Sequence, residues 1–95
     1  MADNRAGTEA YEAMIQELQK FKSTVSENCA LMQSAAAECA ENMPEDPAAA
    51  KASAAVGTHC GNISAQLEVV DQVIRDLQEE IEEIQAAAAK ADGIE

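Results

Sequence analysis

The sequence predicts an all-α fold in which two long helices fold back on each other as an antiparallel, coiled-coil-like hairpin. Two prolines, Pro44 and Pro47, interrupt the middle of the 95-residue chain. On either side of them, apolar residues recur at alternating spacings of three and four, as in a helix that packs along one seam. A short loop between two helices favours antiparallel pairing. Residues 1–95 are therefore interpreted as one helical-hairpin domain.

The first helix is expected over residues 8–43. Thr8 is placed to cap its first turn, and Glu9 and Glu12 follow there, where acidic groups suit the helix dipole. The helix is expected to end near Asn42 or Met43, because the residue before a proline avoids the helical conformation. Its predicted seam consists of Tyr11, Met14, Leu18, Phe21, Val25, Asn28, Met32, Ala35 and Cys39.

The second helix is expected over residues 47–91, after a turn at residues 44–46. Asp46 is predicted to be its N-cap, and Pro47 occupies the first helical position, where a missing N–H costs nothing. Lys90 and the Asp92-Gly93 pair indicate its end. Its seam is more regular than that of the first helix and consists of Val56, Cys60, Ile63, Leu67, Val70, Ile74, Leu77, Ile81, Ile84 and Ala88.

Small residues gather on both sides of the predicted turn and indicate a close approach of the two helices. Gly57 and Gly61, four residues apart, are expected to extend that approach, although glycine disfavours a helix by about 1 kcal/mol relative to alanine. The alternative is a break at Gly57-Thr58, with Thr58 capping a third helix.

Composition excludes several classes of function. The chain carries 18 acidic and 6 basic residues, a net charge of −12, which disfavours nucleic acid and anionic membrane surfaces. No apolar run is long enough for a membrane span, and we expect no Sec-type signal at the N-terminus. Synthesis in the cytoplasm is the expectation. With 21 alanines and no Trp, the potential core is thin, and packing against a partner would compensate.

No pattern of residues indicates catalysis, a cofactor or a metal site. His59 and Cys60 are neighbours, and neighbouring side chains on a helix diverge too far to act as base and nucleophile. Cys60 is instead expected on the seam, with His59 at the solvent edge. The acidic cluster Glu79, Glu80, Glu82 and Glu83 has no nearby histidine, so we interpret it as a solvated helix face. The chain is therefore not expected to be an enzyme.

Two polar or reactive positions on the first helix have open interpretations. Asn28 at a seam position either fixes the helix register or marks a gap filled by water. Cys29 lies one position away and, in a hairpin, within a helical turn of Cys60. A disulfide between Cys29 and Cys60 is geometrically conceivable in an oxidising compartment.

Apolar residues beyond the two seams predict association with another helical surface. Ile15 and Leu31 widen the apolar face of the first helix, and Val69 and Val73 that of the second. Two helices alone cannot cover both rows, so a homodimer or a complex with another helical protein would complete a four-helix bundle. The residues expected to carry packing and interaction are Ile15, Leu31, Ile63, Leu67, Val69, Val70, Val73, Ile74, Leu77, Ile81 and Ile84.

The overall organisation resembles the small Trp-X-Gly helical-hairpin proteins of bacterial type VII secretion. The likeness lies in two amphipathic helices with one central break and a strongly acidic balance, and it covers nearly the whole chain. The bend reads Asn42-Met43-Pro44-Glu45-Asp46-Pro47 where that family has Trp-X-Gly, and no Tyr begins an export motif after the second helix. The resemblance implies a protein that pairs with a helical partner and is exported folded by a non-Sec route, in the role of a targeting partner for a larger helical-domain substrate.

The alternative interpretation is a cytosolic coiled-coil adaptor or assembly subunit unrelated to secretion. It uses the same apolar pattern only to pair with partner helices. Both interpretations make the chain a protein-protein interaction module.

Overall fold

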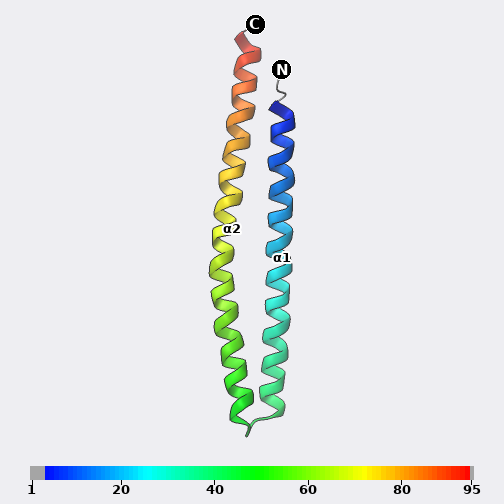
Figure 1. Cartoon of the computed structure of the whole chain (residues 1–95), viewed down its shortest axis with the longest axis vertical. Coiled ribbons are helices and arrows are strands. Elements are labelled where there is room, and N and C mark those ends of the chain that lie inside the picture. Colours follow the sequence, from blue (N-terminus) through cyan, green and yellow to red (C-terminus); the bar gives the residue numbers. More distant parts are fainter. Residues whose placement is uncertain (1–3, 95) are drawn as a thin grey trace. The chain divides into compact units, whose positions relative to one another are not determined.

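The structure, a computed structural model, describes the backbone of residues 4–94 and the side chains of residues 8–91. It contains two helices, α1 (Asn4–Asn42) and α2 (Pro47–Ile94), and no strand among the described residues. The helices are joined by a turn at residues 43–46 and run in opposite directions (Figure 1). The predicted all-α helical hairpin is therefore confirmed.

The hairpin divides into two compact units. Unit 1 combines Met1–Phe21 with Val70–Glu95, and unit 2 is the continuous segment Lys22–Val69, which contains the turn. Each unit thus pairs a segment of α1 with an antiparallel segment of α2. The core of unit 1 is formed by Ile15, Ile74 and Ile81, with Tyr11, Leu18, Val70 and Leu77 packed against them.

The turn has the capping that the sequence predicts. The Asp46 carboxylate accepts a hydrogen bond from the backbone N–H of Ala48 at 2.9 Å, which satisfies one of the free donors at the start of α2. Pro47 is the first residue of that helix. The backbone N–H of Asp46 donates to the carbonyl oxygen of Met43 at 3.1 Å, so the turn is closed by its own hydrogen bond.

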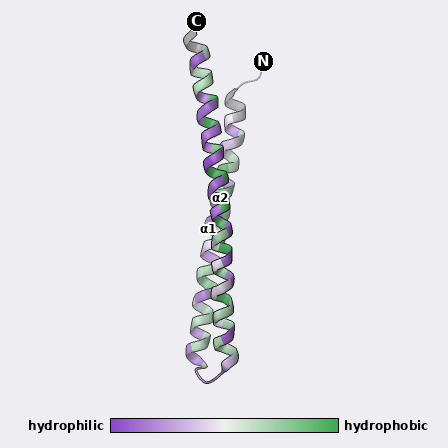
Figure 2. Cartoon of the chain, turned by 90° about the vertical axis from the view of Figure 1, so that its left-hand side faces the viewer, coloured by the Kyte–Doolittle hydropathy of each residue, from purple (hydrophilic) through white to green (hydrophobic). Residues whose placement is uncertain are grey.

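The interior face of α2 follows the predicted seam throughout. Cys60, Leu67, Ile74 and Ile81 are buried, at intervals of seven. The alternate seam positions are half-buried: Val56, Ile63, Val70, Leu77 and Ile84. Strongly hydrophilic residues are most frequent along the upper half of α2, between the seam positions, whereas the segments next to the turn are paler (Figure 2). A single regular apolar row was sufficient to predict this face.

The predicted seam of α1 was correct at Tyr11, Leu18 and Val25, which are half-buried, and wrong between them. Ile15 is buried at 8% exposure, whereas Met14 is 49% exposed. The same shift by one residue recurs along the helix, so the interior holds Lys22, Cys29, Ala36 and Ala40 in place of Phe21, Asn28, Ala35 and Cys39.

The shift has a geometric cause. A residue three before a seam position and a residue four before it lie on opposite flanks of that position, so Met14 and Ile15 both fit a seam through Leu18. The choice depends on the facing helix, and Ile15 packs with Ile74 and Ile81. Ile15 therefore belongs to the core. The sequence had suggested that it lies in an uncovered outer row. Asn28 is exposed and does not act as a buried register residue.

The outer ends of the two helices, away from the turn, lie beyond the predicted ones. α1 begins at Asn4, four residues before the expected start, and Thr8 is a buried residue within the helix instead of its cap. Helix α1 ends at Asn42, in agreement with the expected end near Asn42 or Met43, whereas α2 continues to Ile94, past the Asp92-Gly93 pair. The helices continue past these local capping signals, because each added residue gains a backbone hydrogen bond.

Helix α2 continues through Gly57-Thr58, so no third helix begins there. A β-carbon added to Gly57 or to Gly61 would meet nothing within 4 Å. The expected close helix approach at these glycines was wrong, because Val56 and Cys60 occupy the interior positions. Each glycine lies about 100° further around the helix and faces solvent.

Candidate interaction surface

Among the described side chains of unit 1, three large apolar ones are exposed: Met14, Phe21 and Val73. Met14 and Phe21 are seven residues apart on α1, so they project in nearly the same direction. Val73 directly precedes the buried Ile74 on α2. Phe21, the one Phe of the chain, is 53% exposed, whereas its neighbour Lys22 is half-buried.

These three side chains lie on one side of unit 1. Each precedes an interior position by one residue, which rotates it by about 100° in the same sense around its own helix. Because the two segments run antiparallel (Figure 1), equal rotations on the facing helices point to the same side of the pair. We call Met14, Phe21 and Val73 the apolar side of unit 1.

The opposite side of unit 1 is polar. The residue that follows each interior position points there, and these residues include Glu12, Gln19, Gln78 and Gln85, all exposed. The same side of unit 1 also carries exposed acidic residues, because Glu17, Asp76 and Glu80 each precede an interior position by one residue as well. Asp76 accepts a hydrogen bond from the Gln72 amide at 3.0 Å, and Gln72 accepts one from Arg75 at 3.1 Å. The apolar side thus combines three apolar side chains with a negative margin.

Unit 2 also has exposed apolar side chains. Leu31 is 68% exposed, and Val69, Met32 and Met43 are exposed as well. Val69 is one residue before the half-buried Val70 and so lies on one flank of the interior face of α2. Leu31 is two residues after the buried Cys29, a spacing that turns its side chain nearly away from α2. Of the predicted outer row, Leu31, Val69 and Val73 are therefore exposed, and only Ile15 is buried. Sequence reasoning missed Met14 and Phe21, which it had assigned to the interior.

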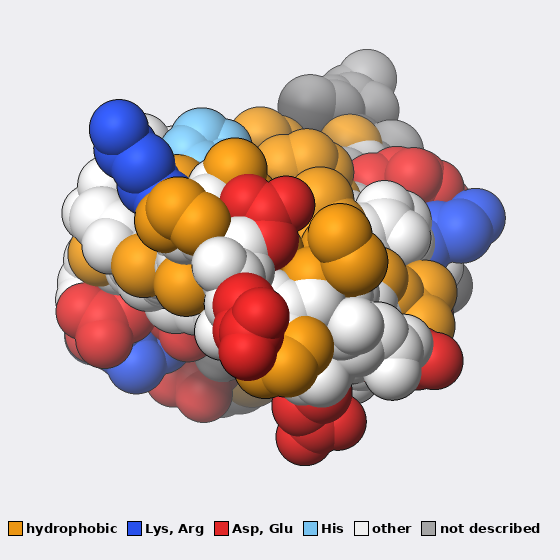
Figure 3. Space-filling view, turned by 90° about the horizontal axis from the view of Figure 1, so that it is seen from below, with side chains coloured by type: hydrophobic (Ala, Val, Ile, Leu, Met, Phe, Trp, Pro, Cys, Tyr) orange, Lys and Arg blue, Asp and Glu red, His pale blue; other side chains and the backbone are white. Residues whose placement is uncertain are grey.

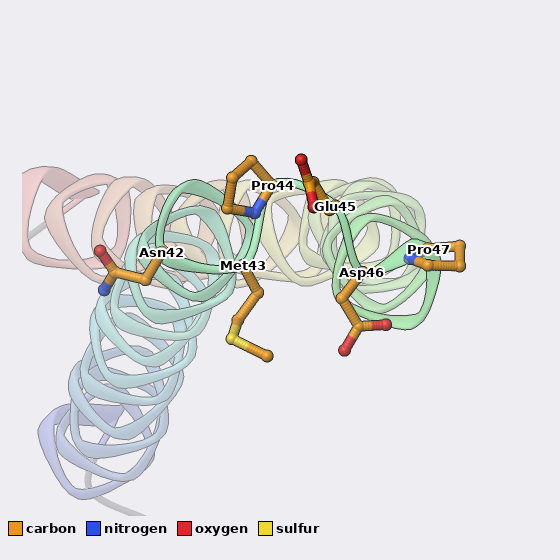
Figure 4. Close-up of a pocket in the computed structure, with 6 residues that line it drawn as sticks. All are labelled: Asn42, Met43, Pro44, Glu45, Asp46 and Pro47. Carbon is orange, nitrogen blue, oxygen red and sulfur yellow. The ribbon is translucent and has the colours of Figure 1, made fainter.

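The turn carries a shallow hollow lined by Asn42, Met43, Pro44, Glu45, Asp46 and Pro47. The side chains of Met43 and Asp46 point to one side of the turn, and Pro44 and Glu45 lie on the other (Figure 4). Seen from this end, apolar and acidic side chains are interspersed on the surface (Figure 3). The Asp46 carboxylate, which lines this hollow, caps α2.

Cys60, His59 and the acidic cluster of α2 are placed as the sequence predicts. Cys60 is buried at 2% exposure and its neighbour His59 is exposed. Glu79, Glu80, Glu82 and Glu83 are exposed on α2. Within residues 8–91, no group of three or more His, Cys, Asp or Glu side chains is arranged to hold a metal ion.

Cys29 and Cys60 meet in the interior of unit 2. The Cys60 thiol donates a hydrogen bond to the backbone carbonyl oxygen of Cys29, with 3.8 Å between sulfur and oxygen. A hydrogen bond with the Cys29 side chain raises the pKa of Cys60 above its ordinary value, and burial and the charge of Cys29 act in the same direction. The protonated thiol is thus the favoured form of Cys60.

Neither described helix has a stretch with the length and apolar character needed to span a membrane. Comparison of the chain with protein-family models, curated proteins and solved structures finds no match. The surfaces described above are therefore the basis for a functional conclusion.

Proposed function

We propose that the chain is a helical protein-protein interaction module and not an enzyme. In this proposal the apolar side of unit 1 binds an amphipathic helix of another protein. The observation that carries the proposal is the placement of Phe21 on the surface while Lys22 occupies the neighbouring interior position. Met14 and Val73 extend the same side.

The energetics favour covering this side. Full burial of a large apolar side chain is worth about 1.5–3 kcal/mol, so three such residues represent a substantial share of the 5–15 kcal/mol that stabilises a typical domain. Exposed aromatic and methionine residues are also the types enriched in the cores of protein interfaces. A helical-hairpin partner would complete a four-helix bundle in this way.

The charge of the surface specifies the kind of partner. Glu17, Asp76 and Glu80 border the apolar side, and the chain carries a net charge of −12. A second copy would bring like charges together, whereas a partner helix with Lys or Arg beside its apolar stripe would bring opposite charges. A heteromeric complex is therefore proposed in preference to a homodimer.

The resemblance to the Trp-X-Gly hairpin proteins gives this module a proposed setting. In that setting the chain is a small type VII secretion-associated protein that accompanies a larger helical-domain substrate and leaves the cell folded with it. A cytosolic adaptor or assembly subunit is the second candidate. It is favoured by the turn sequence Asn42-Met43-Pro44-Glu45-Asp46-Pro47, which lacks the Trp-X-Gly motif.

Photo-crosslinking in the cells that produce the protein tests the proposal. Benzoylphenylalanine placed at Phe21 or at Val73 should crosslink one partner, and the site on that partner should map to a helix with basic residues. The matched controls are Gln19 and Gln78, on the polar side of the same unit, which should give no crosslink. Equal crosslinking from both sides, or products that contain only this chain, would contradict the proposed heteromeric surface.

The same crosslinked partner separates the two settings. If the partner is found outside the cell, and its export stops when this chain is deleted, the secretion role is supported. A partner that stays in the cytosol with the chain supports the adaptor role.

A further inference from the structure

Unit 2 brings two cysteines together from opposite helices. Cys29 of α1 and Cys60 of α2 are 31 residues apart in sequence, and they are 9% and 2% exposed. The 3.8 Å contact between the Cys60 sulfur and the Cys29 carbonyl oxygen places the Cys60 thiol against Cys29 itself. The neighbouring Cys29 side chain also raises the pKa of the Cys60 thiol, and burial acts in the same direction.

The geometry of paired helices is compatible with a covalent bond at this level. Packed helices have axes about 8–10 Å apart, and α-carbons lie about 2.3 Å from each axis. Facing α-carbons are then separated by ~3.4–5.4 Å, and the upper part of this interval lies within the usual range of ~4.4–6.8 Å in disulfides. The small interior residues Ala36, Ala40 and Ala49 favour a close approach in this unit.

We propose that Cys29 and Cys60 form a disulfide bond within the folded chain when it meets a small-molecule disulfide such as oxidised glutathione. The bond joins the two helices of unit 2 across their interior. Cys39 takes no part, because it is exposed and lies ten residues from Cys29 on the same helix, a rise of about 15 Å.

The reaction proceeds by two thiol-disulfide exchanges. The Cys29 thiolate, the more exposed of the two, attacks one sulfur of glutathione disulfide; the glutathione S–S bond breaks, a mixed disulfide forms and one glutathione leaves. The Cys60 thiolate then attacks the Cys29 sulfur and releases the second glutathione. Two thiol protons and two electrons pass to the oxidant, and one S–S bond forms in the protein.

The bond would stabilise the hairpin. It closes a loop that contains the turn and so reduces the conformational freedom of the unfolded chain. For a loop of this size in a small domain, the unfolding temperature is expected to rise by at least ~10 °C. The closing step requires the Cys60 thiolate, so it should become faster as the pH rises towards the raised pKa of Cys60.

The experiment uses the full-length chain with the substitution Cys39→Ser, which removes the exposed thiol. The folded protein is incubated with oxidised glutathione, quenched with iodoacetamide and analysed by mass spectrometry. The expected product has lost two hydrogens, carries no alkyl group and gives a crosslinked peptide of Cys29 with Cys60. Dithiothreitol should reverse both the crosslink and the rise in unfolding temperature.

A matched control moves the cysteine to the wrong side of α1. The variant Cys29→Ser/Leu31→Cys/Cys39→Ser has nearly the same loop length, but its new thiol stands where Leu31 is exposed. In the folded control variant, the reaction with oxidised glutathione should stop at the mixed disulfide with glutathione. The disulfide between the two cysteines of the variant should form only in denaturant. If the Cys39→Ser chain also yields only adducts or unreacted thiols, or if its crosslink lowers the unfolding temperature, the proposal is overturned.

Discussion

Ile15 of α1 and Ile74 of α2 pack in one buried cluster in unit 1, together with Ile81. Each has an exposed neighbour immediately before it in the sequence, Met14 and Val73. On each helix, the exposed side chain of the apolar side and the buried side chain of the core belong to consecutive residues, which point about 100° apart around the helix axis. That separation allows stability and binding to be tested with different substitutions.

Truncation of the buried cluster should destabilise the protein strongly. We expect Ile74→Ala to lower the free energy of unfolding by about 2–5 kcal/mol, because it leaves a cavity in a thin core, and Ile74→Asp to abolish helical structure. Urea unfolding followed by circular dichroism measures both. The control Met14→Ala should cost less than about 1 kcal/mol, and an equal loss there would refute the seam assigned to α1.

Substitution of Phe21 should remove binding without removing the fold. Because the Phe21 side chain is exposed, Phe21→Glu is expected to change the unfolding temperature of the isolated chain by only a few degrees, in line with surface substitutions generally. Capture of the crosslinked partner should fall at least tenfold. Gln19→Glu adds the same charge on the polar side and should leave capture intact; if it is equally harmful, net charge and not the apolar side controls binding.

Loss of the N-cap at the turn should have a moderate effect. Asp46→Ala removes the acceptor for the Ala48 N–H and is expected to reduce stability by about 1 kcal/mol. Asp46→Asn should retain most of that stability, since its side-chain oxygen also accepts. Thermal unfolding compares the two, with Glu45→Ala as the exposed neighbouring control. A larger loss for Glu45→Ala than for Asp46→Ala would show that the cap does not support α2.

The Cys60 thiol should make stability depend on alkaline pH. Its pKa in the folded chain is raised above the ordinary value of 9.0, first by the hydrogen bond with the Cys29 side chain and then by burial. The contribution of the Cys60 thiol to the stability of the fold is therefore complete below pH 9, where the thiol is protonated in both the folded and the unfolded chain. This contribution declines as the pH rises through the pKa of Cys60 in the folded chain. Denaturant midpoints of the reduced protein at pH 8 and pH 10 measure this decline.

Comparison with Cys60→Ala isolates the contribution of this thiol from other groups that titrate in the same range. The difference in stability between the parent chain and Cys60→Ala should shrink at pH 10. A difference that stays constant or grows would mean that the folded state does not favour the protonated thiol.

The sequence by itself determined the two helices, the turn with its Asp46 cap, and the interior face of α2. These features are local: proline restricts the backbone, an N-cap acts within one turn, and the seam from Val56 to Ile84 has one regular apolar row. The sequence also indicated the proximity of Cys29 and Cys60, because the position of the turn sets which residues of an antiparallel pair face each other.

Only the tertiary structure decided which flank of α1 faces inward. Met14 and Ile15 are both apolar and both fit the helical spacing, and hydrophobicity alone favours Phe21 over Lys22 for the interior. The structure places Ile15 and Lys22 inward and leaves Phe21 exposed, and Ile15 packs against Ile74 and Ile81 of α2. A lysine can hold such a position by burying its aliphatic stem while its charge reaches water, so the placement of Phe21 follows from packing between the helices and not from the pattern of either one.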